Sequence, residues 1–214
     1  NGVRKTLDRL KKNIPIDIHE VHTGYKAYDW TVPDEWNIKD AYVMNSDGEK
    51  IIDFKENNLH IVNYSIPIRG HFSFDELKKK IHTDPKRPNI IPYCTTYYNE
   101  DWGFCMSEKE KKKLPNGKYK VFIDSELKKG TLDLSHALIK GKSKKEIFFS
   151  THVCHPSMAN NELSGPVLLN AVLKYVKENY LNNTFSYRFV MHPETVGSIA
   201  YIFKHKNELK KIKK

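Results

Sequence analysis

Two short apolar runs, each closed by a histidine, constrain the fold of this chain more than any other feature. The runs span residues 146–152 and 187–191, and an amphipathic stretch at 164–180 lies between them. A near-continuous apolar run of this length is typical of a strand that is buried on both faces of a sheet. Because such strands alternate with a helix here, the sequence predicts an α/β fold with a parallel or mixed sheet.

The stretch 164–180 is the predicted helix between these strands. Pro166 suits its first turn, and Ser164 is expected to cap it. A nucleophilic role for Ser164 is the weaker alternative, because no G-x-S-x-G sequence surrounds it. The buried stripe of this helix is expected to contain Val167, Leu168, Ala171, Val172, Tyr175 and Val176.

The first 134 residues have a different texture. A short helix is predicted from Val3 to Lys12, and β-branched or aromatic runs separated by turn residues follow it. This pattern indicates a small β-rich unit. Its elements are expected to be strands at 41–44, 50–54, 59–66 and 118–123 and a helix at 73–82.

The charge pattern limits the class of partner. The 36 Lys and Arg exceed the 26 Asp and Glu, but the Lys runs alternate with Glu and Asn. This favours a solvated surface over a nucleic-acid site, and the basic tail 204–214 is expected to be an amphipathic helix. No apolar run approaches the roughly 20 residues of a membrane helix, and three cysteines do not indicate a disulfide framework. We expect a cytoplasmic protein that binds neither membranes nor nucleic acid.

Polar clusters follow both buried strands, at 151–165 and 192–198. In open α/β sheets, ligands bind beyond the carboxyl ends of the strands, where such loops converge. Imidazole nitrogens and carboxylate oxygens are zinc ligands, and a further carboxylate nearby can act as general base. The other histidines, such as His60, His71, His82 and His136, are scattered and lack metal-ligand spacing.

The cluster sequences carry a resemblance. CHPSMANNELSG at 154–165, followed by PETVGS at 193–198, resembles bacterial aminopeptidase-like proteins related to co-catalytic zinc aminopeptidases. Segments at 28–36, 59–65, 91–98 and 102–105 are similar to the N-terminal part of that family and to its inserted domain of unknown function.

The resemblance covers nearly the whole chain and implies a phosphorylase/hydrolase-like mixed sheet with flanking helices, interrupted by a small β-rich inserted domain. The expected parts are an N-terminal aminopeptidase-like part at 1–45, the insert at 46–134 and the continuation at 135–214. Because those enzymes take further ligands from later strands, we expect the chain to be truncated on its C-terminal side.

The resemblance also implies roles for single residues. His155 stands at a metal-ligand position, and Glu194 stands at the position of the general base. Asn161 occupies the position of the metal-bridging Asp, and Thr195 occupies that of a second, ligating Glu. An amide oxygen is a weaker zinc ligand than a carboxylate and bridges two cations poorly. One or two zinc ions are therefore expected, with His155 and Asn161 as ligands.

Several neighbouring residues have two interpretations each. His152 is either a second ligand or a strand-terminal histidine bonded to a backbone carbonyl, and the second role is favoured. Cys154 is more simply a small buried side chain than a thiolate ligand. Glu162 either supports a ligand or only places negative charge near a helix N-terminus.

Two functions follow from these expectations. The first is an aminopeptidase-like zinc-dependent hydrolase, which uses metal-activated water on a peptide or a sugar-linked amide or acyl bond. The alternative, favoured by Asn161 and Thr195, is a non-catalytic binding protein linked to surface polysaccharide biosynthesis. The expected partner is a peptide or glycan-linked small substrate, and homo-oligomerisation stays open.

Overall fold

The computed structural model describes residues 2–180 and 182–212, which form two compact units. Unit 1 combines the residues up to Asp34 with those from Lys129 onward, and unit 2 is the continuous segment Glu35–Lys128. The sequence placed these boundaries at 45/46 and 134/135. The structure divides the chain earlier because the strand β4 (Glu35–Met44) pairs with β9 (Lys118–Lys128) over its whole length.

Unit 1 contains a four-stranded sheet with the order β1-β10-β12-β11. Its strands are β1 (Asp17–His22), β10 (Thr131–Ile139), β12 (Ser186–His192) and β11 (Glu146–His152). The first two pairings are antiparallel, whereas β11 and β12 run parallel. The predicted mixed α/β sheet is therefore confirmed, and both buried strands lie where the apolar runs placed them.

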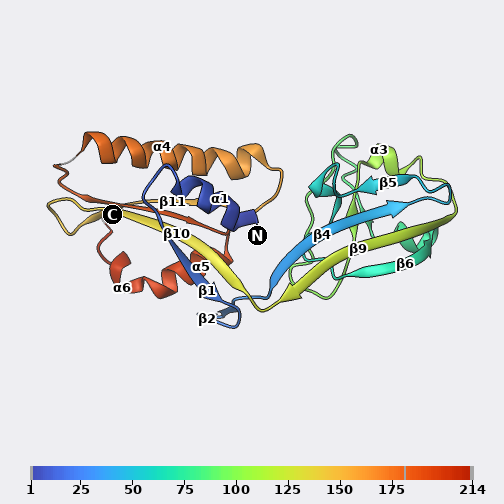
Figure 1. The fold of residues 1–214 in the computed structure, drawn as a ribbon, viewed down its shortest axis with the longest axis horizontal. Helices are drawn as coiled ribbons and strands as arrows, with labels where there is room; N and C mark the ends of the chain where they lie inside the picture. Colours follow the sequence, from blue (N-terminus) through green and yellow to red (C-terminus); the bar gives the residue numbers. More distant parts are fainter. Residues whose placement is uncertain (1, 181, 213–214) are drawn as a thin grey trace. The chain divides into compact units, whose positions relative to one another are not determined.

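Helices cover both faces of this sheet (Figure 1). The helices α1 (Gly2–Lys11) and α4 (Ser164–Asn179) lie on one face, and α5 (Val196–Lys204) and α6 (Lys206–Leu209) on the other. Each face has its own core: Leu7, Leu173 and Phe189 belong to the first, and Val190 and Tyr201 to the second. Within the described residues, none of the helices has the length and apolar character needed to cross a bilayer.

The buried stripe of α4 differs from the predicted one. Leu169 and Leu173 face the sheet, whereas Leu168 and Tyr175 are 65% and 56% exposed. The predicted stripe is right for Val176, which is buried, and for Val172, which packs against the core. It is wrong for the exposed Leu168 and Tyr175, because the apolar residues of this helix cover more than one side. Ser164 also does not cap the helix, because its hydroxyl donates to the carbonyl of Asn160 in the preceding turn.

A glycine allows α4 to approach the sheet closely. A Cβ added to Gly165 would lie 2.0 Å from Oγ1 of Thr151 in β11. We expect Gly165→Ala to lower the free energy of unfolding by about 1–3 kcal/mol, because the helix or the strand must move. Urea unfolding measures this change, with Gly117→Ala as control, since a Cβ there meets nothing within 4 Å. Equal effects of the two substitutions would contradict the close approach.

Unit 2 is built on a second sheet with the order β5-β4-β9-β6, all antiparallel. Its further strands are β5 (Lys50–Asp53) and β6 (Ile68–Ser73). Residues alternate along β9, where Tyr119, Val121 and Ile123 are buried and the residues between them are more exposed. Small elements complete the described chain: β2 (Lys26–Ala27) and β3 (Trp30–Thr31) in unit 1, and η1 (Asn58–His60), α2 (Phe74–Leu77), β7 (Ile81–His82), β8 (Phe104–Cys105) and α3 (Glu108–Lys111) in unit 2.

Three predicted elements are different in the structure. The strand predicted at 59–66 is a 3-10 turn, η1, followed by isolated bridges. The helix predicted at 73–82 begins at the Ser73 capping box with Glu76 but ends at Leu77, and β7 follows. The tail helix predicted at 204–214 is divided at His205 between α5 and α6, and its last two residues lie outside the described residues.

Candidate functional site

The two polar clusters lie at the same edge of the sheet in unit 1. The strands β11 and β12 are parallel, and their last residues, His152 and His192, pair directly. The Val153 amide then donates to the His192 carbonyl at 2.9 Å. The loops that follow the two strands therefore begin side by side at the carboxyl end of the sheet, as the sequence predicted.

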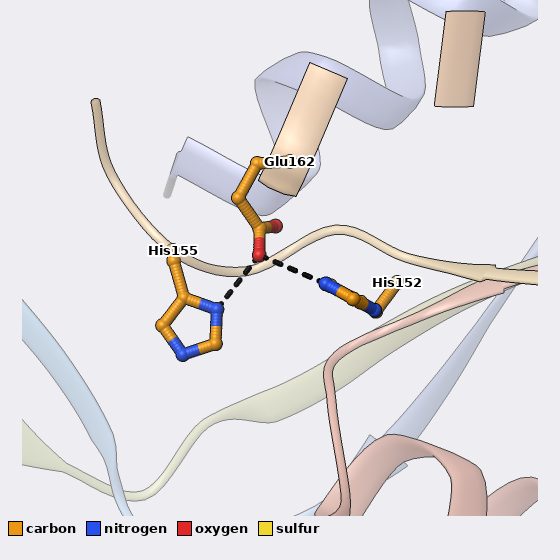
Figure 2. A group of neighbouring side chains, drawn as sticks. All are labelled: His152, His155 and Glu162. Atoms are coloured by element: carbon orange, nitrogen blue, oxygen red, sulfur yellow. Dashed lines mark hydrogen bonds and ion pairs between the residues drawn. The ribbon is translucent and has the colours of Figure 1, made fainter. Parts of the chain in front are cut away.

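A π-helical turn, η2 (Ala159–Leu163), brings Glu162 under the first loop. Glu162 is 5% exposed and accepts hydrogen bonds from the Cys154 amide at 2.5 Å and from His155 Nδ1 at 2.7 Å. The amide donates to Oε2, whereas Oε1, which accepts from His155, also lies 3.3 Å from His152 Nε2. Figure 2 shows both histidines pointing at this one oxygen. Glu162 thus contacts both ring systems, so it does more than place charge near a helix.

These hydrogen bonds keep Glu162 ionised. Burial alone would raise the pKa of Glu162, but the bonds from the Cys154 amide and His155 hold that pKa below its ordinary value. A carboxylate can only accept, so Nδ1 of His155 carries the proton in this contact. The other nitrogen, Nε2, faces the Glu194 carboxylate at 3.5 Å. His155 therefore lies between two carboxylates from two different loops.

Cys154 lies beside His155 and Glu162, but its surroundings do not activate it as a nucleophile. Its sulfur accepts a hydrogen bond from the Glu194 amide at 3.3 Å, which links the two loops. Burial raises the pKa of the Cys154 thiol to about 12, despite the opposing effect of that hydrogen bond. Because the thiolate is the reactive form, a protonated Cys154 at neutral pH is a poor nucleophile.

His192, the last residue of β12, uses both of its ring nitrogens in contacts at this edge of the sheet. Nδ1 lies 3.0 Å from the Pro193 carbonyl and Nε2 lies 2.9 Å from Oγ of Ser150. Since a carbonyl only accepts, Nδ1 donates to it and Nε2 accepts from the hydroxyl. Burial lowers the pKa of His192, which keeps the ring neutral. His192 is a structural residue of this edge.

Of the two residues predicted to be metal ligands, Asn161 contacts a different histidine. Its Oδ1 lies 3.1 Å from Nε2 of His152. His152 is therefore bonded to side chains of η2 rather than to a backbone carbonyl, the role that the sequence favoured. Thr195, which follows Glu194, has φ 57° and ψ −76°, a costly conformation for a β-branched residue. Such strain is often found at functional sites.

Two overlapping groups of side chains place potential metal-ligand atoms close together, as a metal site requires. Within the described residues, the ligand atoms of His152, His155 and Glu162 lie within 4.8 Å of one another, and so do those of Cys154, His155 and Glu194. Nitrogen, oxygen and sulfur donors suit zinc. Metal-ligating histidines usually donate their second nitrogen to a carboxylate, as His155 donates Nδ1 to Glu162. These donor types suit zinc, and the His155 nitrogen that faces away from Glu162 is Nε2, which lies 3.5 Å from the Glu194 carboxylate.

Comparison with known proteins supports the same family. The profile of the family described as a domain of unknown function, DUF4910, matches residues 1–214. A Clostridium acetobutylicum protein is 49% identical over 213 residues, and its name links polysaccharide biosynthesis with an aminopeptidase-like domain. The match covers 100% of this chain and 49% of that protein. The chain thus spans about half the length of this relative.

Solved structures give the fold. A crystal structure from Clostridium acetobutylicum, described provisionally as a peptidase, has a TM-score of 0.95 at 49% identity and covers 100% of this chain and 50% of its own. A zinc aminopeptidase from Bacillus subtilis has a TM-score of 0.58 at 12% identity, over 99% of this chain and 60% of its own. A peptidase M28 precursor from Shewanella amazonensis has a TM-score of 0.60 at 10% identity, over 99% of this chain and 63% of its own.

At 10–12% identity, the two distant matches show a shared fold and nothing about catalysis. The profile match, by contrast, spans every residue of the chain. The chain therefore belongs to the DUF4910 family and has an aminopeptidase-like, mixed α/β fold.

Proposed function

We propose that this chain contributes the zinc-binding edge of a hydrolase that cleaves a peptide or a sugar-linked amide or acyl bond. The observation that carries the proposal is the position of His155 between two carboxylates, with Glu162 at 2.7 Å from Nδ1 and Glu194 at 3.5 Å from Nε2. Glu162 fixes the ring and its tautomer. Nε2 is then directed to the side where Glu194 lies.

Each residue has a separate task in this proposal. His155 holds the metal through Nε2, and Glu162 orients His155. A zinc ion at this position would polarise a carbonyl group and acidify water. Glu194, whose side chain is 55% exposed, accepts a proton from water and returns it to the leaving group. The exposure of Glu194 matches this task, because a base must reach a substrate that enters from solvent.

The substrate class in this proposal draws on two sources. The solved relatives of this fold include zinc aminopeptidases, which favours an amide bond. The Clostridium acetobutylicum relative is named for polysaccharide biosynthesis, which favours a substrate attached to a sugar. The non-catalytic alternative remains a second candidate because Asn161, a neutral amide, is bonded to His152 where the related enzymes have a metal-bridging carboxylate.

Zinc binding tests the proposal. We expect about one zinc per chain by elemental analysis of protein purified without chelator, and at least a hundredfold weaker zinc binding in His155→Ala, because a ligand is lost. Glu162→Gln should weaken binding about 10–100-fold, since it only orients the ligand. Glu194→Gln removes the base but no proposed metal ligand, so it should bind zinc like the unchanged protein and lose hydrolysis of amide substrates.

The control is His22→Ala, which removes an exposed histidine from the same unit. If the unchanged protein binds no stoichiometric zinc, or if His22→Ala and His155→Ala weaken binding equally, the zinc proposal fails. Stoichiometric zinc on His155 without hydrolysis of any amide or acyl substrate would instead favour the binding-protein alternative.

A further inference from the structure

Three histidines that are far apart in the sequence meet in unit 1, on the face of the sheet that α5 covers. His19 belongs to β1, His136 to β10 and His205 to the C-terminal end of α5. Their ring centroids are 4.3 Å apart for His19 and His136, 5.4 Å for His136 and His205, and 6.0 Å for His19 and His205. We call these three residues the histidine cluster. The Tyr201 ring packs on His205 at 4.4 Å.

Each ring of the histidine cluster has a buried nitrogen without a hydrogen-bond partner. These atoms are His19 Nε2, His136 Nδ1 and His205 Nε2. A neutral imidazole needs only one donor contact and one acceptor contact, whereas the protonated ring needs acceptors at both nitrogens. The cluster offers no such acceptors at these atoms. In the described residues, groups of potential metal ligands converge only around His155, so the histidine cluster is not a preformed metal site.

The charges around the cluster also disfavour protonation. The positive charge of Lys204 in α5 lowers the pKa of His19. The positive charge of Arg188 in β12 lowers the pKa of His136 and of His205. Two carboxylates oppose this effect. Asp17 of β1 is exposed, and Glu208 of α6 is 3.9 Å from His205 Nδ1 with its side chain 44% exposed.

The balance of these effects is the same for all three rings. Burial first, and then the neighbouring cations and imidazoles, lower the pKa of His136 to about 4. Burial is also the largest cause of the lowered pKa of His19 and of the lowered pKa of His205. The histidine cluster is therefore neutral at pH 7.

We propose that the histidine cluster is an acid-sensitive latch, which holds α5 on the sheet while its rings are neutral and releases the helix when they take up protons. The latch joins three elements, because His19 and His136 lie on neighbouring strands and His205 ends the helix. At its other end, α5 begins at Val196, directly after Glu194 and Thr195. Release of the helix therefore displaces the loop that carries Glu194. The latch does not depend on the proposed hydrolase activity.

The direction of the pH effect follows from linkage. Histidines in the unfolded chain take up protons near their ordinary pKa of 6.5, whereas the folded cluster takes them up only at lower pH. Stability is therefore fully present above pH 6.5 and is lost as the pH falls below it. For His136 alone, with a pKa of about 4, the folding equilibrium constant should fall roughly twentyfold between pH 7 and pH 5.

Two measurements on the whole chain test the latch. Urea unfolding between pH 5 and pH 7 should show a loss of stability, and His136→Phe should reduce that loss, since phenylalanine fills the site without titrating. His22→Gln is the control, because it removes an exposed histidine from the same strand as His19 and should keep the loss. Amide hydrogen exchange, corrected for intrinsic rates, should show α5 losing at least tenfold more protection than α4 at pH 5.5 relative to pH 7.

Clear outcomes would overturn the latch. One is an unchanged pH dependence in His136→Phe, and the other is a parallel loss of protection in α4 and α5. If His136→Phe does not fold, His205→Gln tests the same point, because it keeps a polar side chain without a titrating ring. An unchanged pH dependence in that variant overturns the proposal equally.

Discussion

Arg188→Ala is expected to lower the free energy of unfolding of unit 1 by about 3–5 kcal/mol, because it leaves a buried carboxylate unpaired. The Arg188 guanidinium forms two hydrogen bonds with Glu146 of the neighbouring strand, at 2.6 Å and 3.1 Å. Both side chains are no more than 5% exposed. A third bond, at 3.3 Å, runs to the Tyr201 hydroxyl in α5. The loss is measured by urea unfolding followed by circular dichroism.

The matched variant replaces both charges. Arg188→Met combined with Glu146→Leu removes the pair without leaving a buried charge, so it should recover most of the stability lost in Arg188→Ala. If the double variant is as unstable as the single one, the cost comes from packing and not from the unpaired carboxylate. A loss below about 1 kcal/mol in Arg188→Ala would show that the pair behaves as an exposed one.

Leu173→Ala should cost about 2–5 kcal/mol, because it empties a fully buried position between α4 and the sheet. Leu168 lies on the same helix but is 65% exposed, so Leu168→Ala should change stability by less than about 0.5 kcal/mol. Urea unfolding of the two variants therefore compares the same chemical change at a buried and at an exposed position. The result also decides between the predicted and the observed stripe of α4.

Equal losses for Leu173→Ala and Leu168→Ala would contradict the observed orientation of the helix. A larger loss for Leu168→Ala would mean that α4 presents the predicted stripe to the sheet. We expect the much larger loss for Leu173→Ala, because Leu169, Leu173 and Val176 form the core between α4 and the sheet.

The residues around His155 were also predicted only in part. The motifs placed His155 and Glu194 at neighbouring strand ends, and the structure brings them to 3.5 Å. Glu162 was left with two interpretations, because its position in a π-helical turn cannot be derived from spacing. A carboxylate seven residues after a loop histidine was the available signal. Asn161 was predicted to be a ligand together with His155, and the structure shows its contact with His152.

The histidine cluster could not be found from the sequence at all. His19, His136 and His205 have no common spacing, and His136 was judged to be an isolated residue. Strand alternation places His19 on one face of β1, but only the pairing of β1 with β10 brings His136 beside it. The end of α5 then adds His205.

The sequence by itself determined the elements whose patterns are local. The strands β11 and β12, the helix between them and the Ser73 cap all depend on residues within one short segment, so periodicity and capping chemistry located them. Tertiary structure decided which side of α4 is buried, where unit 2 begins and which side chains meet at His155. These features depend on contacts between segments that are distant in the chain, and the apolar spacing of a single segment does not specify its partner.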